Sequence, residues 1–519
     1  MKYFLLFLCS TCLSLPAQHV FESRLSHTYS LGIQDIELLQ DGMMLMAANA
    51  QPPFLHDSSI AMLLKVDSSH QVLWSRRFKA FARDDFSCIT QLSDGNFLIG
   101  GSMRQDFINQ SGAGIYKVDS AGTVLWHKVY SDSFDDRVLE IFEMADSSLM
   151  IFIRHGVTNR PTKIVHASVT GDILSQQIYY FSSSVGVFAE KVIRGTNGTF
   201  YLTGDVRNNE PRFVSFVCAL EAGSMMMNWC KFYDLGADVS SHHLAELSDG
   251  SLIVGGNIIE SVVTNANNTW LMKLDDAGTV SWAHSYAQPE FGNEFMTGLA
   301  IVEQDEILTF GKAFGSPSSD GFGMRLDASG STVHWVKRYN QFEDQSVSGP
   351  LFLPDGRMLL TGFSSGSSLL LTTSASGESF CSHIDSSFVV SVLTVEDSTV
   401  SPTSDLPTIE TNVPTISVAD DSIAVESICG GNVRIEEDLE QWLNVYPVPV
   451  ADWLTIELTQ VDMNSLTVKI LDMTGRLFIE ESLTGKEISQ LDVSSLVGGV
   501  YLLTIQGNRG RAVRKFVKE

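Results

Sequence analysis

The stretch Lys117-Val118-Asp119-Ser120-Ala121-Gly122-Thr123-Val124-Leu125-Trp126, followed by Tyr130, recurs along the chain. Close copies occupy residues 65–78, 273–286 and 325–339, and each ends in an aromatic residue. Weaker copies occupy residues 168–179, 220–233 and 377–381. The copies are about 50 residues apart, and a fixed period of that length is typical of repeated supersecondary units.

A second signature lies between these copies. It is clearest in Leu92-Ser93-Asp94-Gly95, which precedes an apolar run, and it returns within residues 247–256 and 353–362. Weaker versions lie at Asp41-Gly42, Asp146, Asn197-Gly198 and Asp305. Asp-Gly is a typical hairpin turn, so each unit is predicted to be a four-stranded antiparallel meander. Both signatures occur seven times, which predicts an all-β fold, a seven-bladed β-propeller over residues 18–381.

A large aromatic residue recurs at one position of the better copies, namely Trp74, Trp126, Trp229, Trp282 and Trp335. A small twisted sheet has a face that only its neighbour can bury, and a Trp side chain covers much area there. We therefore interpret these residues as packing between blades. The alternative is an aromatic ligand site, which would be expected in one or two blades rather than in every good copy.

The Asp-x-x-Gly-x-x-x-Trp element of residues 119–126 resembles the tryptophan-docking repeat of pyrroloquinoline-quinone-type propellers. It resembles the Asp-box of sialidase-type propellers more loosely. Both resemblances imply a propeller. The activities of those families depend on residues that we do not find in this sequence, so the resemblance implies the fold and not the activity.

Composition excludes several functions. The 519 residues include 34 Lys+Arg against 61 Asp+Glu, a formal net charge of -27, and show no local basic patch. Nucleic acid is therefore not an expected ligand. Hydrophobic residues make up 44% and charged residues 18%, which is the balance of a folded chain. The length predicts at least two folded units.

Residues 1–17 have a basic start, a short apolar run and a small residue at Ala17, which predicts a signal peptide. No later segment approaches the length of a transmembrane helix. Export permits disulfides. Cys218 and Cys230 could pair across a hairpin, and Cys381 and Cys429 bracket a Ser/Thr/Pro-rich segment, although plain buried thiols would fit the same spacing.

The repeat stops at residues 382–440. This segment contains 12 acidic side chains against Arg434 alone, and Ser, Thr and Pro are frequent. Such a composition predicts a solvated, extended linker, in which residues 389–395 and 423–428 could form strands.

Residues 441–519 alternate apolar and polar side chains again, which predicts a small C-terminal β-sandwich. The segment resembles the C-terminal sorting domain of type IX secretion substrates of the Bacteroidetes group. The residues that carry this resemblance are Tyr446, Pro447 and Pro449 in the opening motif, Asp472 and Gly475 in the central strand, and Gly499, Val500, Tyr501, Lys515 and Phe516 near the end.

The resemblance implies that the type IX secretion machinery is a partner of residues 441–519. It also implies a protein that is secreted or held on the outer-membrane surface of a Gram-negative bacterium. Residues 1–17 would direct the first step of export, across the inner membrane.

No pattern identifies a catalytic residue, a cofactor site or a metal site. His-Glu-x-x-His is absent, and Asp84-Asp85 lacks the alternating oxygen ligands of a calcium loop. We favour a non-catalytic propeller that binds a glycan or a protein through variable loops. A hydrolase or a quinoprotein-like enzyme is the alternative, and buried carboxylates in the central channel would favour it. A structural surface component is a third option. The variable loops are residues 104–114, 208–212, 261–268 and 315–320.

Overall fold

The computed structural model describes residues 22–519 except for 53–58, 81–82, 105–110, 132–135, 156–161, 181–185, 208–211, 262–265, 289–292, 316–317, 340–343, 380–382, 400–402, 406–409, 413–414, 430–442, 459–465, 473–476, 484–487 and 508–509. The predicted signal peptide lies outside the described residues. The chain divides into two compact units, Met1–Cys429 and Gly430–Glu519. Apart from the 3-10 turn η1 (Glu303–Asp305), every described element is a β-strand.

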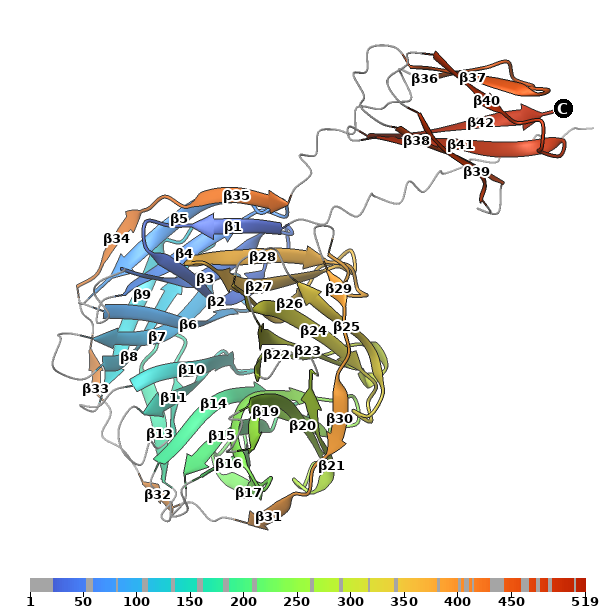
Figure 1. Ribbon diagram of the computed structural model, residues 1–519. Coiled ribbons are helices and arrows are strands. Elements are labelled where there is room, and N and C mark those ends of the chain that lie inside the picture. The colour runs from blue at the N-terminus through green and yellow to red at the C-terminus, as the bar shows by residue number, and fades with distance from the viewer. Residues whose placement is uncertain are drawn as a thin grey trace, which may run out of the picture. The chain divides into compact units, whose positions relative to one another are not determined.

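Seven five-stranded antiparallel sheets make up the described part of the first unit (Figure 1). The inner strands are β2 (Ser30–Leu38), β6 (Arg83–Gln91), β10 (Asp136–Glu143), β14 (Gly186–Arg194), β18 (Asp238–Glu246), β22 (Asn293–Ile301) and β26 (Gln345–Phe352). The second strands are β3 (Met44–Gln51), β7 (Phe97–Arg104), β11 (Leu149–His155), β15 (Phe200–Arg207), β19 (Leu252–Ser261), β23 (Ile307–Phe314) and β27 (Met358–Ser364). The third strands are β4 (Ile60–Val66), β8 (Ser111–Val118), β12 (Thr162–Ala167), β16 (Phe213–Leu220), β20 (Ala266–Leu274), β24 (Asp320–Leu326) and β28 (Ser367–Thr373). The fourth strands are β5 (Val72–Lys79), β9 (Val124–Ser131), β13 (Ile173–Tyr180), β17 (Met227–Asp234), β21 (Val280–Ala287), β25 (Val333–Tyr339) and β1 (Glu22–Ser26).

The sheets form a propeller-like arrangement. Each inner strand contacts the inner strand of the next sheet, and β2 of the first sheet contacts β27 and β28 of the last. The amino-terminal strand β1 pairs with β28 and so supplies the fourth strand of the last sheet. The two ends of the sheet series are therefore joined by backbone hydrogen bonds rather than by loops alone.

The recurring Trp and Tyr side chains hold neighbouring sheets together. A Cβ built on Gly330 would lie 2.5 Å from Cη2 of Trp282 in the preceding sheet, and Tyr286 Oη donates a 2.6 Å hydrogen bond to the Gly330 carbonyl. The same Trp–Gly contact joins Trp74 to Gly122, Trp126 to Gly171, Trp229 to Gly278 and Trp335 to Gly377. Gly330 has φ +67, which favours glycine for a second reason.

The seam between the last and first sheets is built differently. His70, with φ 63, stands where five of the other six turns between third and fourth strands have glycine and the sixth has Met225. Its imidazole hydrogen-bonds Ser23 Oγ of β1 at 3.1 Å and Thr372 Oγ1 of β28 at 3.0 Å. Burial lowers the pKa of His70 to about 4, so the ring is neutral at pH 7. A hydrogen-bonded histidine therefore fills this seam in place of a Trp–Gly contact.

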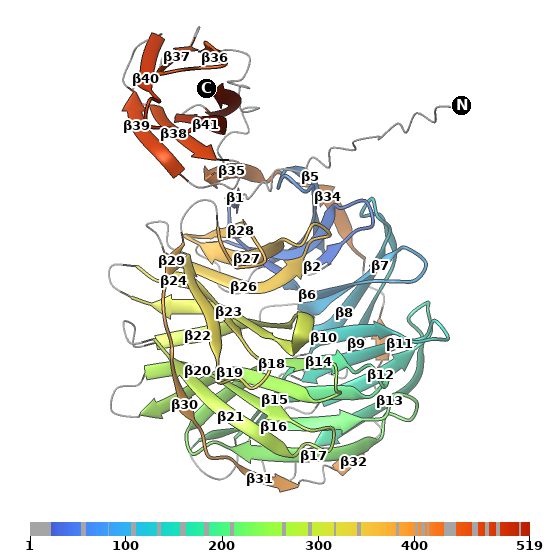
Figure 2. The ribbon, with the colours of Figure 1, turned by 90° about the vertical axis from the view of Figure 1, so that its right-hand side faces the viewer.

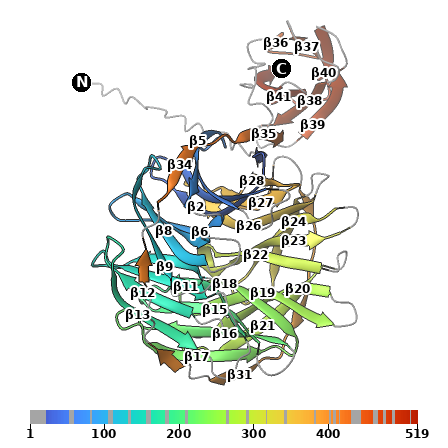
Figure 3. The ribbon, with the colours of Figure 1, turned by 90° about the vertical axis from the view of Figure 1, so that its left-hand side faces the viewer.

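Residues 384–429 form a strap that adds the fifth, outermost strand to every sheet (Figures 2 and 3). The chain passes the sheets in reverse order, from the β22 sheet back to the β2 sheet and then to β1. The strap strands are β29 (Ile384–Asp385), β30 (Val389–Val392), β31 (Glu396–Thr399), β32 (Thr403–Asp405), β33 (Glu410–Asn412), β34 (Ser417–Asp420) and β35 (Ala424–Cys429). The first unit therefore extends to Cys429 and not to residue 381, which differs from the predicted solvated linker. The strands β30 and β35 do lie where residues 389–395 and 423–428 were expected to form strands.

The acidic composition of the strap matches basic residues on the strands that it covers. Lys337 Nζ lies 2.6 Å from Asp385 Oδ1, Lys231 Nζ lies 3.4 Å from Asp397 Oδ2, and Arg76 Nε lies 3.5 Å from Asp420 Oδ1. The carboxylates are 41–88% exposed, so each pair contributes little by itself. Apolar contacts add to them: Phe388 is 9% exposed and its ring lies 5.4 Å from that of Phe322.

The second unit contains two antiparallel sheets that share one apolar core of Leu, Ile, Val, Tyr and Phe side chains. One sheet has the order β36 (Leu443–Tyr446), β37 (Trp453–Leu458), β40 (Ile488–Asp492). The other has the order β39 (Leu477–Leu483), β38 (Leu466–Asp472), β41 (Gly499–Gly507), β42 (Gly510–Lys518).

Replacing Gly330 with Ala should destabilise the first unit more than replacing Gly198 with Ala. Both glycines have positive φ, but a Cβ at Gly198 would meet nothing within 4 Å, whereas one at Gly330 would overlap Trp282. Overpacking of this kind costs about 1–3 kcal/mol. The two free energies of unfolding, measured in urea, should differ by that amount. Equal values would show that the Trp282 contact is not tight.

Replacing Phe388 with Ala should lower the free energy of unfolding by about 3 kcal/mol, the cost of truncating a buried Phe. Val392 is 82% exposed in the same strap, and Val392→Ala should change the value by less than about 0.5 kcal/mol. If both variants unfold like the parent protein, the strap does not belong to the cooperative unit.

Candidate functional site

The inner strands share an irregularity at the middle of each sheet. In every one of them the register with the second strand shifts by one residue. Such a bulge bends a strand and redirects a side chain. The extra residues are Gln34, Ser87, Leu139, Glu190, His242, Thr297 and Gly349.

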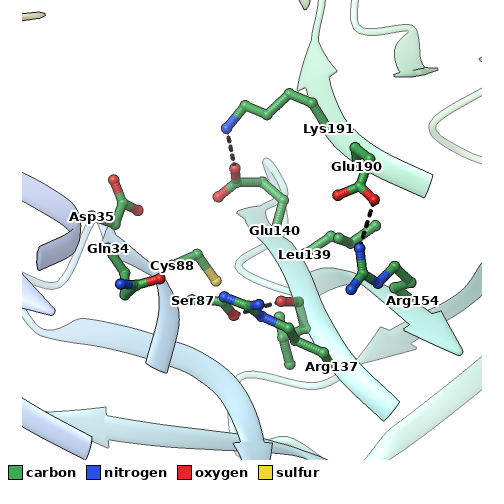
Figure 4. A pocket seen from close by; sticks show the side chains of 11 residues that line it. Gln34, Asp35, Ser87, Cys88, Arg137, Leu139, Glu140, Arg154, Glu190 and Lys191 are labelled. Carbon is green, nitrogen blue, oxygen red and sulfur yellow. Dashed lines mark hydrogen bonds and ion pairs between the residues drawn. The ribbon is translucent and has the colours of Figure 1, made fainter. Parts of the chain in front are cut away.

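Four successive bulges line a polar cavity of about 210 Å³ (Figure 4). Gln34, Ser87, Leu139 and Glu190 come from β2, β6, β10 and β14, and Arg154 comes from β11. The remaining lining residues are Asp35, Cys88, Arg137, Val138, Glu140 and Lys191. At about 30 Å³ for each water molecule, the cavity has room for about seven waters or one small polar ligand.

Two ion pairs cross the cavity between neighbouring sheets. Lys191 Nζ donates to Glu140 Oε2 at 2.9 Å, and Arg154 Nη1 donates to Glu190 Oε1 at 2.7 Å (Figure 4). The Glu140 carboxylate raises the pKa of Lys191. The Lys191 side chain is nevertheless 43% exposed, because it borders the open cavity rather than a packed core.

Asp35 is a carboxylate of this site whose pKa is raised. Its Oδ1 accepts a hydrogen bond from the Ile36 amide at 2.9 Å, and its Oδ2 accepts one from the Ile89 amide at 2.8 Å. Burial, and secondarily the negative charge of Glu140, raise the pKa of Asp35 to about 7. Asp35 can therefore hold or release a proton near neutral pH.

A second acidic group lies on the β15 strand beside the next inner strand. Asp205 Oδ1 accepts a hydrogen bond from the Ser241 amide at 2.5 Å, and Asp205 Oδ2 lies 4.0 Å from His242 Nε2. Burial raises the pKa of Asp205 to about 8 and lowers the pKa of His242. The carboxyl group is thus largely neutral at pH 7, and the His–Asp contact is not a strong ion pair.

The cavity offers donors and acceptors of both charges but no evident nucleophile. Burial raises the pKa of the Cys88 thiol well above its usual range, which suppresses the thiolate. Within the described residues, no group of three or more His, Cys, Asp or Glu side chains is arranged to hold a metal ion. The site can bind a polar ligand, and Asp35 could exchange a proton with it.

The residues singled out from the sequence lie elsewhere. All five repeat Trp residues are at the interfaces between sheets and none lines the cavity. Cys218 and Cys230 face each other on β16 and β17 and are joined by a disulfide. Cys381 and the side chain of Cys429 lie outside what the structure describes, as does much of the predicted variable loops.

The sorting residues lie in the second unit. Tyr446 ends β36 and is 43% exposed, whereas Tyr501 and Phe516 are buried with ring centroids 5.8 Å apart. Lys515 is exposed on β42, and Gly499 and Val500 begin β41. Pro447 and Pro449 follow β36. Gly475 and the side chain of Asp472 lie outside the described residues.

Sequence reasoning missed the cavity, although a positional signal exists. Asp35, Glu140 and Lys191 each stand six residues before the Asp or Asn of an Asp-Gly-type turn, namely Asp41, Asp146 and Asn197. Residues at the same offset in a repeat occupy the same place in each sheet. Three charged residues at one such offset indicate that charged side chains from different sheets lie at the same level of the inner strands.

Comparison with known protein families gives a match for the C-terminal segment. Residues 444–519 match the family described as the secretion system C-terminal sorting domain. No curated protein matches the chain. The described residues contain no helix long and apolar enough to span a membrane.

Several solved structures are similar to this chain at low identity. One is a polysaccharide lyase, a PL25 ulvan lyase, with TM-score 0.42, 9% identity, 65% of this chain and 92% of that chain covered. Another is a protein of unknown function from Dyadobacter fermentans, with TM-score 0.40, 10% identity, 68% and 98% covered. A sialidase from Trypanosoma rangeli has TM-score 0.33, 10% identity, 94% and 84% covered. At such low identities and TM-scores, the similarity says nothing about the activity of this chain.

The sorting domain supports export by the type IX secretion system. It indicates a secreted or cell-surface protein of a Gram-negative bacterium of the Bacteroidetes type.

Deleting residues 444–519 should prevent surface delivery, because the segment that matches the sorting domain is lost while the predicted signal peptide remains. Fractionation of cells that express the full and truncated chains should find the truncated chain in the periplasm. A periplasmic enzyme and an outer-membrane protein serve as fraction markers. Normal surface delivery of the truncated chain would contradict the role of the tail.

Proposed function

We propose that the first unit is a closed seven-bladed β-propeller of the tryptophan-docking type and that it binds a glycan without transforming it. The second unit is then a β-sandwich that serves as the sorting signal for export. The observation that carries the binding role is the channel cavity, in which the Glu140–Lys191 and Arg154–Glu190 pairs converge.

The chemistry of the cavity favours a polyhydroxylated ligand. A sugar hydroxyl both donates and accepts hydrogen bonds, so it can satisfy a carboxylate and a guanidinium group at once. An apolar ligand would remove water from these charged groups without replacing their hydrogen bonds, which is costly. A cavity of about 210 Å³ fits a single sugar unit or a chain end better than a folded partner.

A specific observation favours an enzyme as the second candidate. Asp35, with a pKa of about 7, lies near Glu140. A carboxyl group that can hold a proton near neutral pH, beside a second carboxyl group, is a pair of the kind used for acid and base catalysis of sugar bonds. The hydrolase alternative is therefore retained, with Asp35 as the acid.

Calorimetric titration of the full chain with a panel of mono- and disaccharides tests the binding role. Arg154→Met should weaken binding at least tenfold, because it removes a hydrogen-bond donor and leaves Glu190 unpaired. Lys273→Met is the matched control, since it breaks the Lys273–Asp249 pair of 3.2 Å outside the cavity. The role is contradicted if no sugar binds or if both variants bind like the parent.

The same panel separates binding from hydrolysis. Incubation followed by chromatography should recover the ligand unchanged. If the ligand is consumed instead, Asp35→Asn should abolish turnover while retaining binding, and the rate should fall as the pH rises through about 7 because the acid loses its proton.

A further inference from the structure

Two aromatic clusters, each with a cation over one ring, lie outside the cavity. In the β14 sheet the rings of Phe188 and Phe213 are 5.7 Å apart, and Arg207 Cζ lies 5.7 Å from the centre of the Phe213 ring. In the β22 sheet the rings of Phe295 and Phe314 are 5.3 Å apart, and Lys312 Nζ lies 4.6 Å from the centre of the Phe314 ring. We call these the Phe213 and Phe314 platforms.

Both platforms lie at the same end of the first unit. Hydrogen bonds from Ser93 to Glu143 and from Ser248 to Asp305 join neighbouring Asp-Gly-type turns, which places these turns together at one end. Phe188 and Phe295 are the third residues of their inner strands, and both strands begin at the opposite end. Each stands two residues before the bulge residue of its strand.

The Phe rings of the platforms are exposed to solvent and are not packed into the apolar core. Phe295 is 36% exposed and Phe314 is 43% exposed, and neither belongs to an apolar core cluster of the described residues. Phe188 and Phe213 are half-buried. Grouped, exposed aromatic rings usually mark a binding surface, because their hydration is unfavourable.

The two cations are available for a ligand. Two other basic side chains at this end are held by carboxylates: Arg83 by Asp85 at 2.9 Å, and Arg212 by Asp234 at 2.5 Å. Arg207 and Lys312 form no ion pair with any residue that the structure describes. Asp344 is close enough for the charge of Lys312 to help hold its pKa low, but the two are not an ion pair.

The net charge of -27 repels an anionic ligand at long range, so binding of such a ligand depends on nearby cations. Carboxylates gather at the turn end, where they accept hydrogen bonds from turn amides, and along the strap. At the platform end, carboxylates such as Asp85 and Asp234 are paired with arginines. The charges of Arg207 and Lys312 can attract an anion at distances within a Debye length, about 8 Å at physiological salt.

We propose that the Phe213 and Phe314 platforms bind a polysaccharide that carries carboxylate or sulfate groups. The apolar C–H face of a sugar ring packs on an exposed Phe ring, while the neighbouring Arg207 or Lys312 holds the acidic group by a charge-assisted hydrogen bond. This proposal rests on the glycan-binding role and adds its ligand class and a second contact region, distinct from the cavity.

Affinity electrophoresis of the full chain through gels that contain polygalacturonate, chondroitin sulfate or neutral dextran tests the proposal. The uronate polymer, the sulfated polymer or both should retard the protein, and dextran should not. Retardation should fall as salt rises from about 50 to 500 mM, because the contact is partly ionic. Equal retardation by dextran, or none by any polymer, would overturn the proposal.

Phe314→Ala and Lys312→Ala should each weaken the binding at least tenfold. Phe352→Ala is the matched control, since Phe352 is also 43% exposed but ends β26 at the turn end. The proposal fails if Phe352→Ala weakens binding as much as Phe314→Ala, or if neither platform variant weakens it.

The cavity variant separates the two proposals. Arg154→Met should lose binding of small sugars in calorimetry and keep the retardation by the acidic polymer. Loss of both in Arg154→Met would overturn the independence of the platforms. Retained polymer binding without any small-sugar binding would overturn the cavity role alone.

Discussion

The docking of one sheet onto the next is the constraint on which the rest of the first unit depends. A four-stranded sheet cannot bury both of its faces, so each relies on its neighbour. Here the indole of one sheet lies against a glycine turn of the next, and a Tyr hydroxyl donates to the carbonyl of the same glycine, as with Trp282, Tyr286 and Gly330. The glycine is required twice, by its positive φ and by the ring that occupies the place of a Cβ. Where Ser175 replaces the Trp, Met225 with φ 56 takes the place of the glycine, and the Tyr179 hydroxyl donates to its carbonyl. A side chain is therefore found at this turn position where the indole is missing.

Docking of the sheets leaves the backbone groups at the outer edge of every sheet unpaired, and the strap strands pair with them. An exposed edge presents free backbone N–H and C=O groups that can pair with other chains. Residues 384–429 cover all seven edges in reverse order, while β1 completes the last sheet. The strap needs little apolar surface, because backbone hydrogen bonds and ion pairs such as Lys337–Asp385 supply most of its contacts. Its acidic composition is thus explained by the basic side chains on the strands that it covers.

The sequence predicts the sheets because their determinants are local and repeated: an Asp-Gly turn, an Asp-x-x-Gly turn and a Trp at fixed spacing. It does not predict the strap, whose strands have only two to six residues and whose pairing partners lie up to about 400 residues away in the chain. Short polar segments carry no periodic signal of their own. The cavity was missed for another reason. Asp35, Glu140 and Lys191 differ in type, so a search for repeated residues passes over them, although they share one offset from the turns.

The residues of the proposed binding site and the contacts that stabilise the sheets occupy different parts of the same repeat. At pH 7 the charge of Asp35 is unfavourable for folding. A rise in the pKa of Asp35 from 3.8 to about 7 means that ionising it in the folded state costs about 4 kcal/mol more than in the unfolded chain. Stability from this group is therefore gained as the pH falls from 7 towards 4. The Trp–Gly contacts at the turn end and the strap hydrogen bonds at the outer edge offset this loss of stability. Neither set of contacts involves the bulge residues of the inner strands. The bulge positions are thus free to carry different side chains in each sheet. That separation explains how seven similar sheets can have charged residues at the bulges of some inner strands, as with Glu140 and Lys191, and Thr297 and Gly349 at the bulges of others.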